Sequence, residues 1–391
     1  MIKYRLIFLL SFGHLVTDIN QGALPAILPF LISEYNLTYS AGASIVFAAN
    51  SSSAIVQPLF GYLADRLSRP WLIPLAVLVA GVGLGATGLM DSYATAVILA
   101  VVSGIGIAAF HPQGARLVNF AAAGKKGTSM SFFGLGGILG FAIGPILATW
   151  ALVSMGLKGT AVLIIPVAIA SVLLLSHLSS FNKLEKEDRE LKSNNQTILK
   201  EDRWLAFLLL SFIIVVRSIT FYGINTFIPL YWTGYLNETV ARGGIALSVI
   251  AVSGVFGNIF GGWISDRIGF KKMIIWGNFC IAILLPIMIF TDHPTIALIA
   301  LIPIGFTMAT TYSPTIVMGQ EYLPNRVGFS SGVTLGISVA FGGIAAPFIG
   351  MIGDSYGIWA ALASVAFLPV ICFLLSLFLP APDSGLSVEN K

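Results

Sequence analysis

Long apolar runs are the feature that most constrains this chain. A helix that crosses the ~30 Å hydrocarbon core of a bilayer needs about 20 mostly apolar residues, and helices are one of the few structures that satisfy all their backbone polar groups within lipid. The runs lie at residues 6–32, 41–63, 71–90, 94–118, 128–154, 159–178, 204–233, 243–264, 272–291, 295–319, 328–353 and 357–379. They predict an all-α integral membrane protein with twelve transmembrane helices.

The composition and the motif inventory argue against an enzyme. Hydrophobic residues make up 57% of the chain and charged residues 10%, against about 45–50% and roughly 25% in soluble domains. The two cysteines, Cys280 and Cys372, both lie in apolar runs and suggest neither a disulfide framework nor a metal cluster. The sequence contains no phosphate-binding loop, metalloprotease motif or nucleophile elbow. We therefore expect no catalysis, no cofactor and no bound metal.

The positive charges predict an orientation. With the N-terminus inside, eighteen of the 21 Lys and Arg residues, from Lys3 to Lys391, fall in cytoplasmic segments. Cytoplasmic loops of membrane proteins carry such an excess, so both termini are expected in the cytoplasm. The same placement explains the net charge of +4 without a nucleic-acid partner.

The chain divides into two similar halves. Residues 1–178 hold six spans, 179–203 form a charged cytoplasmic linker, 204–379 hold six more spans, and 380–391 form a cytoplasmic tail. Gly61-Tyr-Leu-Ala-Asp65-Arg66 recurs about 200 residues later as Gly262-Trp-Ile-Ser-Asp266-Arg267. Parallel six-helix repeats place a substrate site between the halves. The linker mixes both signs of charge, so we expect a solvated, partly helical connection rather than a regulatory site.

Three motifs resemble those of a known family. The repeated Gly-x-x-x-Asp-Arg resembles the cytoplasmic signature of major facilitator transporters, and the run from Gly136 to Pro145 resembles the glycine–proline motif of exporters in that family. The stretches 13–29 and 110–116, with His14, Asp18 and Phe-His-Pro, resemble the fosmidomycin-resistance branch. That resemblance implies the major facilitator fold, the bacterial inner membrane and drug export in exchange for protons. One departure is Ala100, where many proton-coupled antiporters have an arginine.

Asp18 is the main candidate for proton coupling. It lies near the middle of the first apolar run, where a charge costs roughly 2.5–3.5 kcal/mol on insertion scales and therefore tends to face a cavity or a partner. His14, Asp18 and Gln21 share one helix face by their spacing. We hypothesise that Asp18 binds and releases the coupling proton while His14 tunes or relays it. The alternative is a static hydrogen-bonded pair that holds two helices together.

Arg217 is the corresponding candidate in the second half. It lies midway along the seventh run, at a depth similar to that of Asp18. Its guanidinium stays charged, and its planar fork suits bidentate binding of a phosphonate or carboxylate. We hypothesise that it binds the anionic head of the substrate. The alternative is a permanent ion pair with Asp18 or Glu321.

His111 directly precedes Pro112 inside the fourth run, and a proline there leaves a backbone carbonyl without its donor. His111 is expected to contact substrate or proton; alternatively it is a buried histidine that bonds to the freed carbonyl. Each further candidate for substrate binding has a helix-packing hydrogen bond as its alternative role. These candidates are Gln21, Asn50, Gln57, Phe221, Asn225 and Thr311.

The resemblance also implies a gate. Asp65 is expected to meet a helix N-terminus of the second half, Arg66 to pair with a cytoplasmic carboxylate, and Gly61 to permit close backbone approach. Asp266 and Arg267 are expected to play the symmetric part. A topology anchor is the alternative role, and it explains the arginines but not the repeated aspartate.

These observations predict a secondary active transporter that exports a small amphiphilic or anionic compound, such as a fosmidomycin-like drug or a metabolite, by proton antiport. The expected partners are that small molecule, protons and the lipid bilayer, with the chain acting as a monomer. One alternative is a proton-coupled symporter or uniporter that imports a small organic anion. A membrane sensor that transports nothing is a further alternative.

Overall fold

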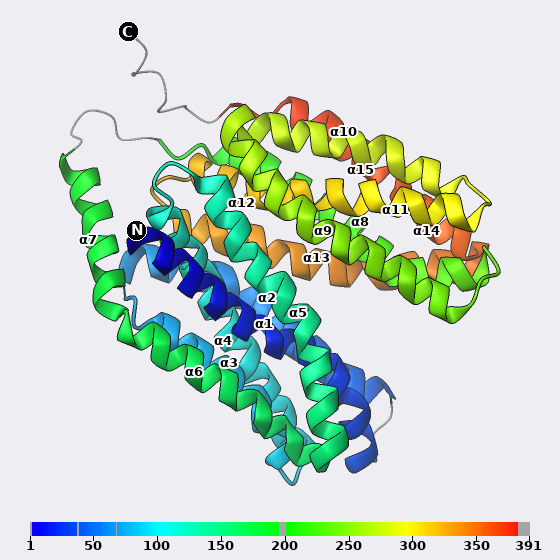
Figure 1. The fold of residues 1–391 in the computed structure, drawn as a ribbon, viewed down its shortest axis with the longest axis horizontal. Coiled ribbons are helices and arrows are strands. Elements are labelled where there is room, and N and C mark those ends of the chain that lie inside the picture. The colour runs from blue at the N-terminus through cyan, green and yellow to red at the C-terminus, as the bar shows by residue number, and fades with distance from the viewer. Residues whose placement is uncertain (1, 37–38, 68, 195–200, 382–391) are drawn as a thin grey trace. The chain divides into compact units, whose positions relative to one another are not determined.

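The computed structural model describes residues 2–36, 39–67, 69–194 and 201–381, and every regular element in this part of the chain is helical (Figure 1). The first seven α-helices are α1 (Ile2–Glu34), α2 (Tyr39–Leu67), α3 (Leu72–Gly85), α4 (Tyr93–Ala121), α5 (Lys126–Met155), α6 (Ile164–Ser176) and α7 (Leu178–Asn194). The other eight are α8 (Trp204–Gly234), α9 (Val240–Ile268), α10 (Phe270–Ile289), α11 (Pro294–Thr310), α12 (Tyr312–Tyr322), α13 (Val327–Tyr356), α14 (Ile358–Ala366) and α15 (Leu368–Leu377).

The twelve predicted spans are confirmed, and the third, sixth, tenth and twelfth contain an internal break. The sixth span starts as a 3-10 helix, η2 (Gly156–Leu163), before α6. The tenth span is divided into α11 and α12 at Thr311, and the twelfth into α14 and α15 at Phe367. A second 3-10 helix, η1 (Thr87–Leu89), follows α3. Part of the predicted linker, residues 195–200, and the tail 382–391 with Lys391 lie outside the described residues.

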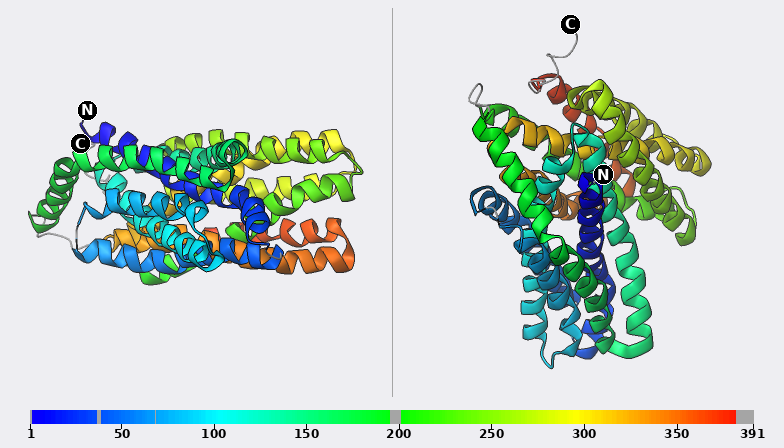
Figure 2. Two further views of the ribbon diagram at one scale, coloured as in Figure 1. Left: turned by 90° about the horizontal axis from the view of Figure 1, so that it is seen from below. Right: turned by 60° about the vertical axis from the view of Figure 1, so that its left-hand side comes forward.

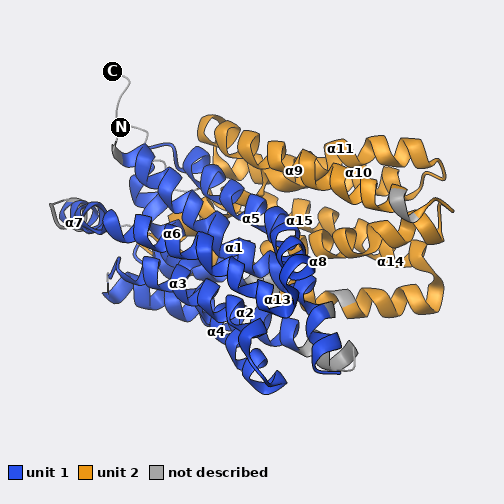
Figure 3. Ribbon diagram, turned by 60° about the horizontal axis from the view of Figure 1, so that its bottom comes forward, with its two compact units in different colours: residues 1–200, 325–336 blue, residues 201–324, 337–391 orange. Residues whose placement is uncertain are grey.

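The chain forms two compact units (Figure 3). Unit 1 comprises residues 1–200 and 325–336, and unit 2 comprises residues 201–324 and 337–391. The first turns of α13 therefore belong to unit 1, although they lie in the second half of the sequence. The predicted domain boundaries at 178, 203 and 379 stay a prediction.

Unit 1 is organised around the close pairing of α1 and α5, which run side by side in Figures 1 and 2. Gly136, Gly140 and Gly144 of α5 lie against the backbone of α1, where an added Cβ would collide with carbonyl oxygens of Ser11, Leu15 and Ile19. Small residues at four-residue spacing bring membrane helices together in this way. In the same unit α4 packs against α2 and α3, and α6 packs against α3.

Unit 2 has its own apolar interior. Helix α8 packs against α9, α14 and α15, while α11 packs against α9 and α10. Tyr231 and Trp232 of α8 are almost fully buried among aliphatic side chains, and the Tyr231 hydroxyl donates to the carbonyl oxygen of Ile289 at 3.0 Å. That bond satisfies the one polar group that the tyrosine brings into the interior.

The outer surface of both units is apolar, which agrees with contact with lipid. Large aliphatic and aromatic side chains such as Ile55, Ile146, Leu205 and Phe348 are more than half exposed. A soluble monomer rarely exposes extensive apolar surface. Helix α7 differs: it buries Phe181 and Leu184 and exposes charged residues such as Lys186, as an amphipathic helix does.

Candidate functional site

A cluster of three ionisable side chains lies inside unit 1. Helix α1 contributes His14 and Asp18, one turn apart, and α4 contributes His111. His14 Nε2 lies 3.2 Å from Asp18 Oδ2, and His111 Nε2 lies 3.1 Å from Asp18 Oδ1. All three side chains are buried, with Asp18 only 4% exposed. The structure thus brings together three residues that the sequence singled out separately; we call them the His–Asp–His centre.

The outer ring nitrogens of both histidines are held by backbone carbonyls. His14 Nδ1 lies 2.7 Å from the carbonyl oxygen of Phe133, and His111 Nδ1 lies 2.9 Å from that of Ile107. A carbonyl oxygen only accepts hydrogen bonds, so each Nδ1 carries a hydrogen. The carbonyl at His111 belongs to Ile107, whereas the one that Pro112 frees belongs to Ala108.

Because Nδ1 of each histidine carries a hydrogen, the role of the other ring nitrogen, Nε2, is fixed as well. A neutral imidazole protonated at Nδ1 presents a lone pair at Nε2, and both Nε2 atoms face a carboxylate oxygen of Asp18. Two lone pairs at about 3 Å repel each other unless a proton lies between them, so the contacts are attractive only when the centre has taken up protons. Oδ1 of Asp18 accepts no well-aligned hydrogen bond, although it is fully buried.

The surroundings of the centre are apolar and tightly packed. The His14 ring stacks on Phe133 with 4.1 Å between ring centroids. Gly137 of α5 faces the acid, and a Cβ there would lie 2.7 Å from both Asp18 Oδ2 and His14 Nε2. The side-chain amide of Gln57 on α2 lies beside the His111 ring, 3.4 Å from Nδ1, which already donates to the Ile107 carbonyl. Of the other predicted unit 1 residues, Gln21 and Asn50 are partly exposed.

Asp65 bonds to the N-terminus of α13 within unit 1. Its Oδ1 accepts from the backbone N–H of Gly328 and its Oδ2 from that of Phe329, both at 2.8 Å. The first N–H groups of a helix lack intrahelical partners and attract negative charge. Gly61 lies so close to Gly328 that an added Cβ would collide with the Gly328 carbonyl oxygen. These contacts have the form that the resemblance implied for this motif.

Arg116, which the sequence placed among the positive-inside charges and at the end of the 110–116 stretch, contacts both Asp65 and Glu185. Its Nη1 donates to Glu185 Oε1 of α7 at 2.6 Å, and its Nε lies 3.2 Å from Asp65 Oδ1. Arg116 and Glu185 are both buried. A sequence signal existed: Arg116 ends the Phe-His-Pro-Gln-Gly-Ala-Arg stretch, and Glu185 lies on the apolar face of a short amphipathic segment.

The predicted gating arginines contact aromatic rings. The Arg66 guanidinium lies 4.7 Å from the ring centroid of Tyr62, and that of Arg267 lies 3.8 Å from the ring centroid of Trp263. Each ring precedes its arginine by one helical turn, so the local arrangement repeats in the two halves. Asp266, the counterpart of Asp65, lies one residue before Arg267 near the end of α9.

Arg217 lies in the interior of unit 2. Its Nη1 donates to Thr311 Oγ1 at 3.0 Å, and its guanidinium lies 5.7 Å from the ring centroid of Tyr312. Among the described residues of unit 2, neither Glu321 nor any other carboxylate forms an ion pair with it. Thr311 is fully buried and holds the guanidinium in place.

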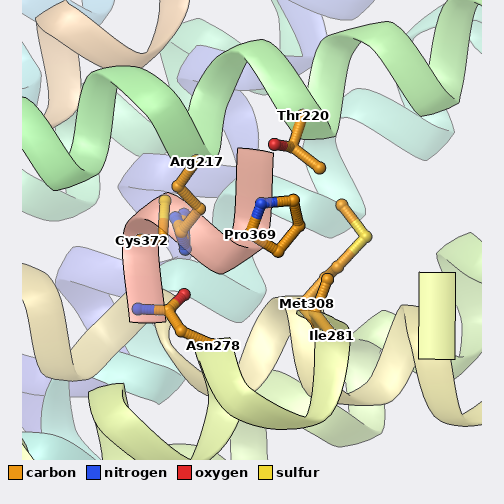
Figure 4. Close-up of a pocket in the computed structure, with 7 residues that line it drawn as sticks. All are labelled: Arg217, Thr220, Asn278, Ile281, Met308, Pro369 and Cys372. Carbon is orange, nitrogen blue, oxygen red and sulfur yellow. The ribbon is translucent and has the colours of Figure 1, made fainter. Parts of the chain in front are cut away.

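Arg217 also lines a small cavity that the sequence did not indicate (Figure 4). The cavity lies among α8, α10, α11 and α15, and its other lining residues are Thr220, Asn278, Ile281, Met308, Pro369 and Cys372. Asn278 was not singled out, because a lone asparagine in an apolar run has no distinctive pattern. Phe221 and Asn225 of α8 are more accessible than Arg217's partner Thr311, and the Asn225 side-chain amide donates to the Phe221 carbonyl at 2.8 Å.

The fold and the buried charges are those of a polytopic membrane protein, and its family and relatives identify it as a transporter rather than an enzyme. The Major Facilitator Superfamily matches residues 10–335. That match covers most of the chain, and the protein belongs to this superfamily.

Two named relatives indicate the branch of the superfamily to which the chain is most similar in sequence. The chain is 28% identical to the fosmidomycin resistance protein of Escherichia coli (strain K12) over 379 residues, which cover 95% of this chain and 91% of that protein. It is also 28% identical to the uncharacterized MFS-type transporter YfnC of Bacillus subtilis (strain 168), over 97% of this chain and 93% of that one. These similarities support a transporter in the fosmidomycin-resistance-like branch.

Solved structures agree on the fold. The proton:xylose symporter XylE matches with a TM-score of 0.75 at 16% identity, over 97% of this chain and 96% of that one. The human organic anion transporter MFSD10 matches with a TM-score of 0.76 at 13% identity, over 96% and 99% of the two chains. At these identities the likeness concerns the fold alone, so the predicted major facilitator fold is confirmed.

Proposed function

We propose that this protein exports a small amphiphilic or anionic compound, of the fosmidomycin type or a metabolite, across a bacterial inner membrane in exchange for protons. The observation that carries the proposal is the His–Asp–His centre. Two imidazoles face the two oxygens of one buried carboxylate, and their outer nitrogens are fixed as donors to backbone carbonyls.

The centre has the properties that a coupling site needs. Its contacts become attractive on protonation and repulsive on deprotonation, so proton binding changes the force that holds α1 against α4. Buried ionisable groups in a membrane span are costly and commonly mark proton pathways. Asp18 is the proposed proton carrier, and His14 and His111 are the groups that share its protons. His111 would supply the fourth-helix partner that Ala100 does not.

For the cargo we propose the accessible polar and aromatic residues on both units. Gln21 and Asn50 in unit 1 and Phe221 and Asn225 in unit 2 are exposed enough to contact a solute. Gln57 and Thr311 are buried against His111 and Arg217, so they act by positioning those two groups. Arg217 provides positive charge at an interior position, which favours an anionic cargo.

The gate is a second part of the proposal. Asp65, held by the α13 N-terminus, and Gly61, in close backbone contact, would lock one side of the transporter in one state and release it in another. Arg66, Asp266 and Arg267 would act with them at the same side. With both termini in the cytoplasm, that side is the cytoplasmic one. The protein is proposed to work as a monomer.

A symporter or uniporter that imports a small organic anion remains the second candidate, because Arg217 favours an anion in either direction. Steady-state accumulation of labelled fosmidomycin in bacteria expressing the chain, with and without a protonophore, separates the two. Export by proton antiport predicts lower accumulation than in empty cells and its restoration by the protonophore. Accumulation equal to that of empty cells would remove fosmidomycin as cargo, and higher accumulation would indicate import.

A further inference from the structure

The His–Asp–His centre has the composition of a metal site as well as that of a proton site. Two imidazoles and one carboxylate, from helices α1 and α4, meet inside unit 1. One ligand atom from each of the three residues lies within 4.8 Å of the other two. Two imidazoles with one carboxylate are a ligand set found in zinc sites, and imidazole also suits copper, iron and nickel. The centre therefore offers the donor atoms that a divalent transition-metal ion prefers.

Both imidazoles are already oriented as metal ligands. His14 Nδ1 and His111 Nδ1 each donate to a backbone carbonyl, at 2.7 and 2.9 Å. Histidines that bind metals commonly donate their outer N–H to a carbonyl or a carboxylate, which fixes the tautomer and the orientation of the ring. The remaining nitrogen, Nε2, then carries the lone pair. Both Nε2 atoms face the same carboxylate, that of Asp18, so the three donors are directed at one another.

The distances within the centre are close to those of a zinc site. Zinc binds imidazole nitrogen at about 2.0–2.1 Å and carboxylate oxygen at about 2.0–2.2 Å, so its tetrahedral ligands lie about 3.4 Å apart. The two nitrogen–oxygen distances, 3.2 and 3.1 Å, already approach this value. A movement of at most about 1.5 Å brings the most distant pair of ligand atoms to the same separation. Because the ion would lie between atoms that already face each other, it needs no separate cavity.

The charge of the centre also permits the exchange. The contacts between the carboxylate and the two rings are attractive when each Nε2 carries a proton. One Zn²⁺ ion has the charge of those two protons, so its binding releases both to solvent and leaves the net charge unchanged. The described neighbours that contact the rings, Phe110, Phe133 and Gln57, carry no charge that would repel the ion.

We propose that the His–Asp–His centre binds one divalent metal ion of the zinc type, through His14 Nε2, His111 Nε2 and the Asp18 carboxylate, in place of two protons. Because the ion occupies the groups that share the coupling protons, zinc should block proton-driven transport. That consequence rests on the proposed function, whereas the binding itself does not. No metal motif in the sequence indicates this site, because its ligands come from two helices about ninety positions apart.

The first test is a calorimetric titration of the purified full-length protein in detergent, freed of any affinity tag, with zinc chloride. We expect saturable binding of one ion per chain with release of protons, which is measured by comparing buffers of different ionisation enthalpy. Magnesium should not bind, because it prefers octahedral oxygen ligands. X-ray absorption at the zinc edge should show imidazole ligands in the same complex.

Histidine variants locate the ion. His14→Gln and His111→Gln each remove one ligand and should lower the zinc affinity at least tenfold, since even the loss of an outer partner of a metal ligand costs about 10–100-fold. His177→Gln and His293→Gln are the matched controls. These are the other two of the four histidines, and they lie at the end of α6 and before α11, outside the centre. Both controls should bind zinc like the wild type.

Two results would overturn the proposal. A wild-type protein that binds no zinc, or whose bound zinc shows no imidazole ligand, would show that the centre takes up protons only. Zinc affinity that is unchanged in both His14→Gln and His111→Gln would place the ion elsewhere. The wild-type measurements do not depend on any variant folding.

Transport in the presence of zinc separates this proposal from the proposed function. The measurement is proton-driven uptake into proteoliposomes at a zinc concentration that saturates the site, and we expect the uptake to be lost. Undiminished uptake with zinc bound at the centre would leave the metal site standing and exclude the centre from coupling. Absence of zinc binding would overturn the metal site and leave proton coupling intact.

Discussion

The two units each bury a charged centre, and the two centres are built differently. In unit 1 a carboxylate lies between two imidazoles at 3.1 and 3.2 Å. In unit 2 a guanidinium bonds to one threonine hydroxyl, and no carboxylate among the described residues of that unit pairs with it. The first centre consists of groups that can bind and release protons. The second contains a group that keeps its charge.

This difference suggests a division of labour. A centre that can gain and lose protons is suited to coupling, while a permanent cation is suited to holding an anion. The two units also differ in how they offset the free-energy cost of burying a charge. The charges of unit 1 compensate each other inside the protein, whereas no carboxylate among the described residues of unit 2 pairs with Arg217.

Asp18→Asn is the strongest test of this division. The substitution keeps the size of the side chain but replaces one ionisable oxygen with an amide N–H donor, so we expect proton-driven transport to be abolished. The measurement is uptake of labelled cargo into proteoliposomes driven by an imposed pH gradient. Thr17→Val is the matched control, because the Thr17 hydroxyl bonds only to the Gly13 carbonyl on its own helix, and it should transport normally. Undiminished gradient-driven uptake in Asp18→Asn would exclude Asp18 from coupling.

Glu185→Gln tests what happens when a buried arginine of unit 1, Arg116, loses a carboxylate partner, as Arg217 has none among the described residues of unit 2. It removes one of the two carboxylates around Arg116 and leaves a buried cation partly uncompensated. Removal of one partner from a buried ion pair destabilises by about 3 kcal/mol, which chemical unfolding in micelles would detect. Glu190→Gln breaks only an exposed pair with Lys186 on the same helix and should cost less than about 0.5 kcal/mol. Equal losses of stability in Glu185→Gln and Glu190→Gln would show that the buried Arg116–Glu185 pair contributes no more to stability than an exposed pair.

Gly137→Ala tests how closely the His–Asp–His centre is packed. The new Cβ would lie 2.7 Å from Asp18 Oδ2 and from His14 Nε2, so the side chains must move apart. We expect a loss of about 1–3 kcal/mol in stability together with slower proton-driven transport. As a control, Gly244→Ala adds a Cβ with no heavy atom within 4 Å and should be neutral or slightly stabilising. Normal transport by Gly137→Ala would mean that the contacts of the centre are looser than the structure indicates.

Arg217→Lys has the smallest expected effect, because it keeps the charge and removes the planar fork. The bond from the guanidinium to Thr311 is lost with the planar fork, so we expect the affinity for an anionic cargo to fall by roughly tenfold. Competition binding with the purified protein measures this directly. Unchanged affinity would rule out a directional contact and leave only a general effect of positive charge.

Much of the fold could be predicted because lipid imposes length and polarity on each span. The twelve apolar runs matched the helices within a few residues, except where η1, η2, Thr311 and Phe367 interrupt a span. Such breaks depend on how neighbouring helices pack, and the apolar composition on both sides is the same. The glycine ladder of α5 was visible as a motif, but only the structure shows that α1 lies against it.

The candidate site was predictable in part. Asp18, His14 and His111 stood out because ionisable residues are rare in apolar runs, yet nothing in the sequence related His111 to Asp18, which lies about ninety positions away. Arg116 was hidden among the positive-inside charges and Asn278 among apolar neighbours. Arg116 gains its significance from partners on other helices, and Asn278 from the cavity that it lines together with Arg217.

The sequence by itself therefore determined the class of this protein: apolar run length dictates membrane helices, and the repeated Gly-x-x-x-Asp-Arg indicates two related halves. The tertiary structure alone decided which charges meet. Packing of α1 against α4 and α5 puts two imidazoles on one carboxylate, and packing of α8 against α12 brings the Arg217 guanidinium to Thr311 and Tyr312. The physical reason is that burial makes each charge depend on its nearest partner, and in a helical bundle that partner comes from a distant part of the chain.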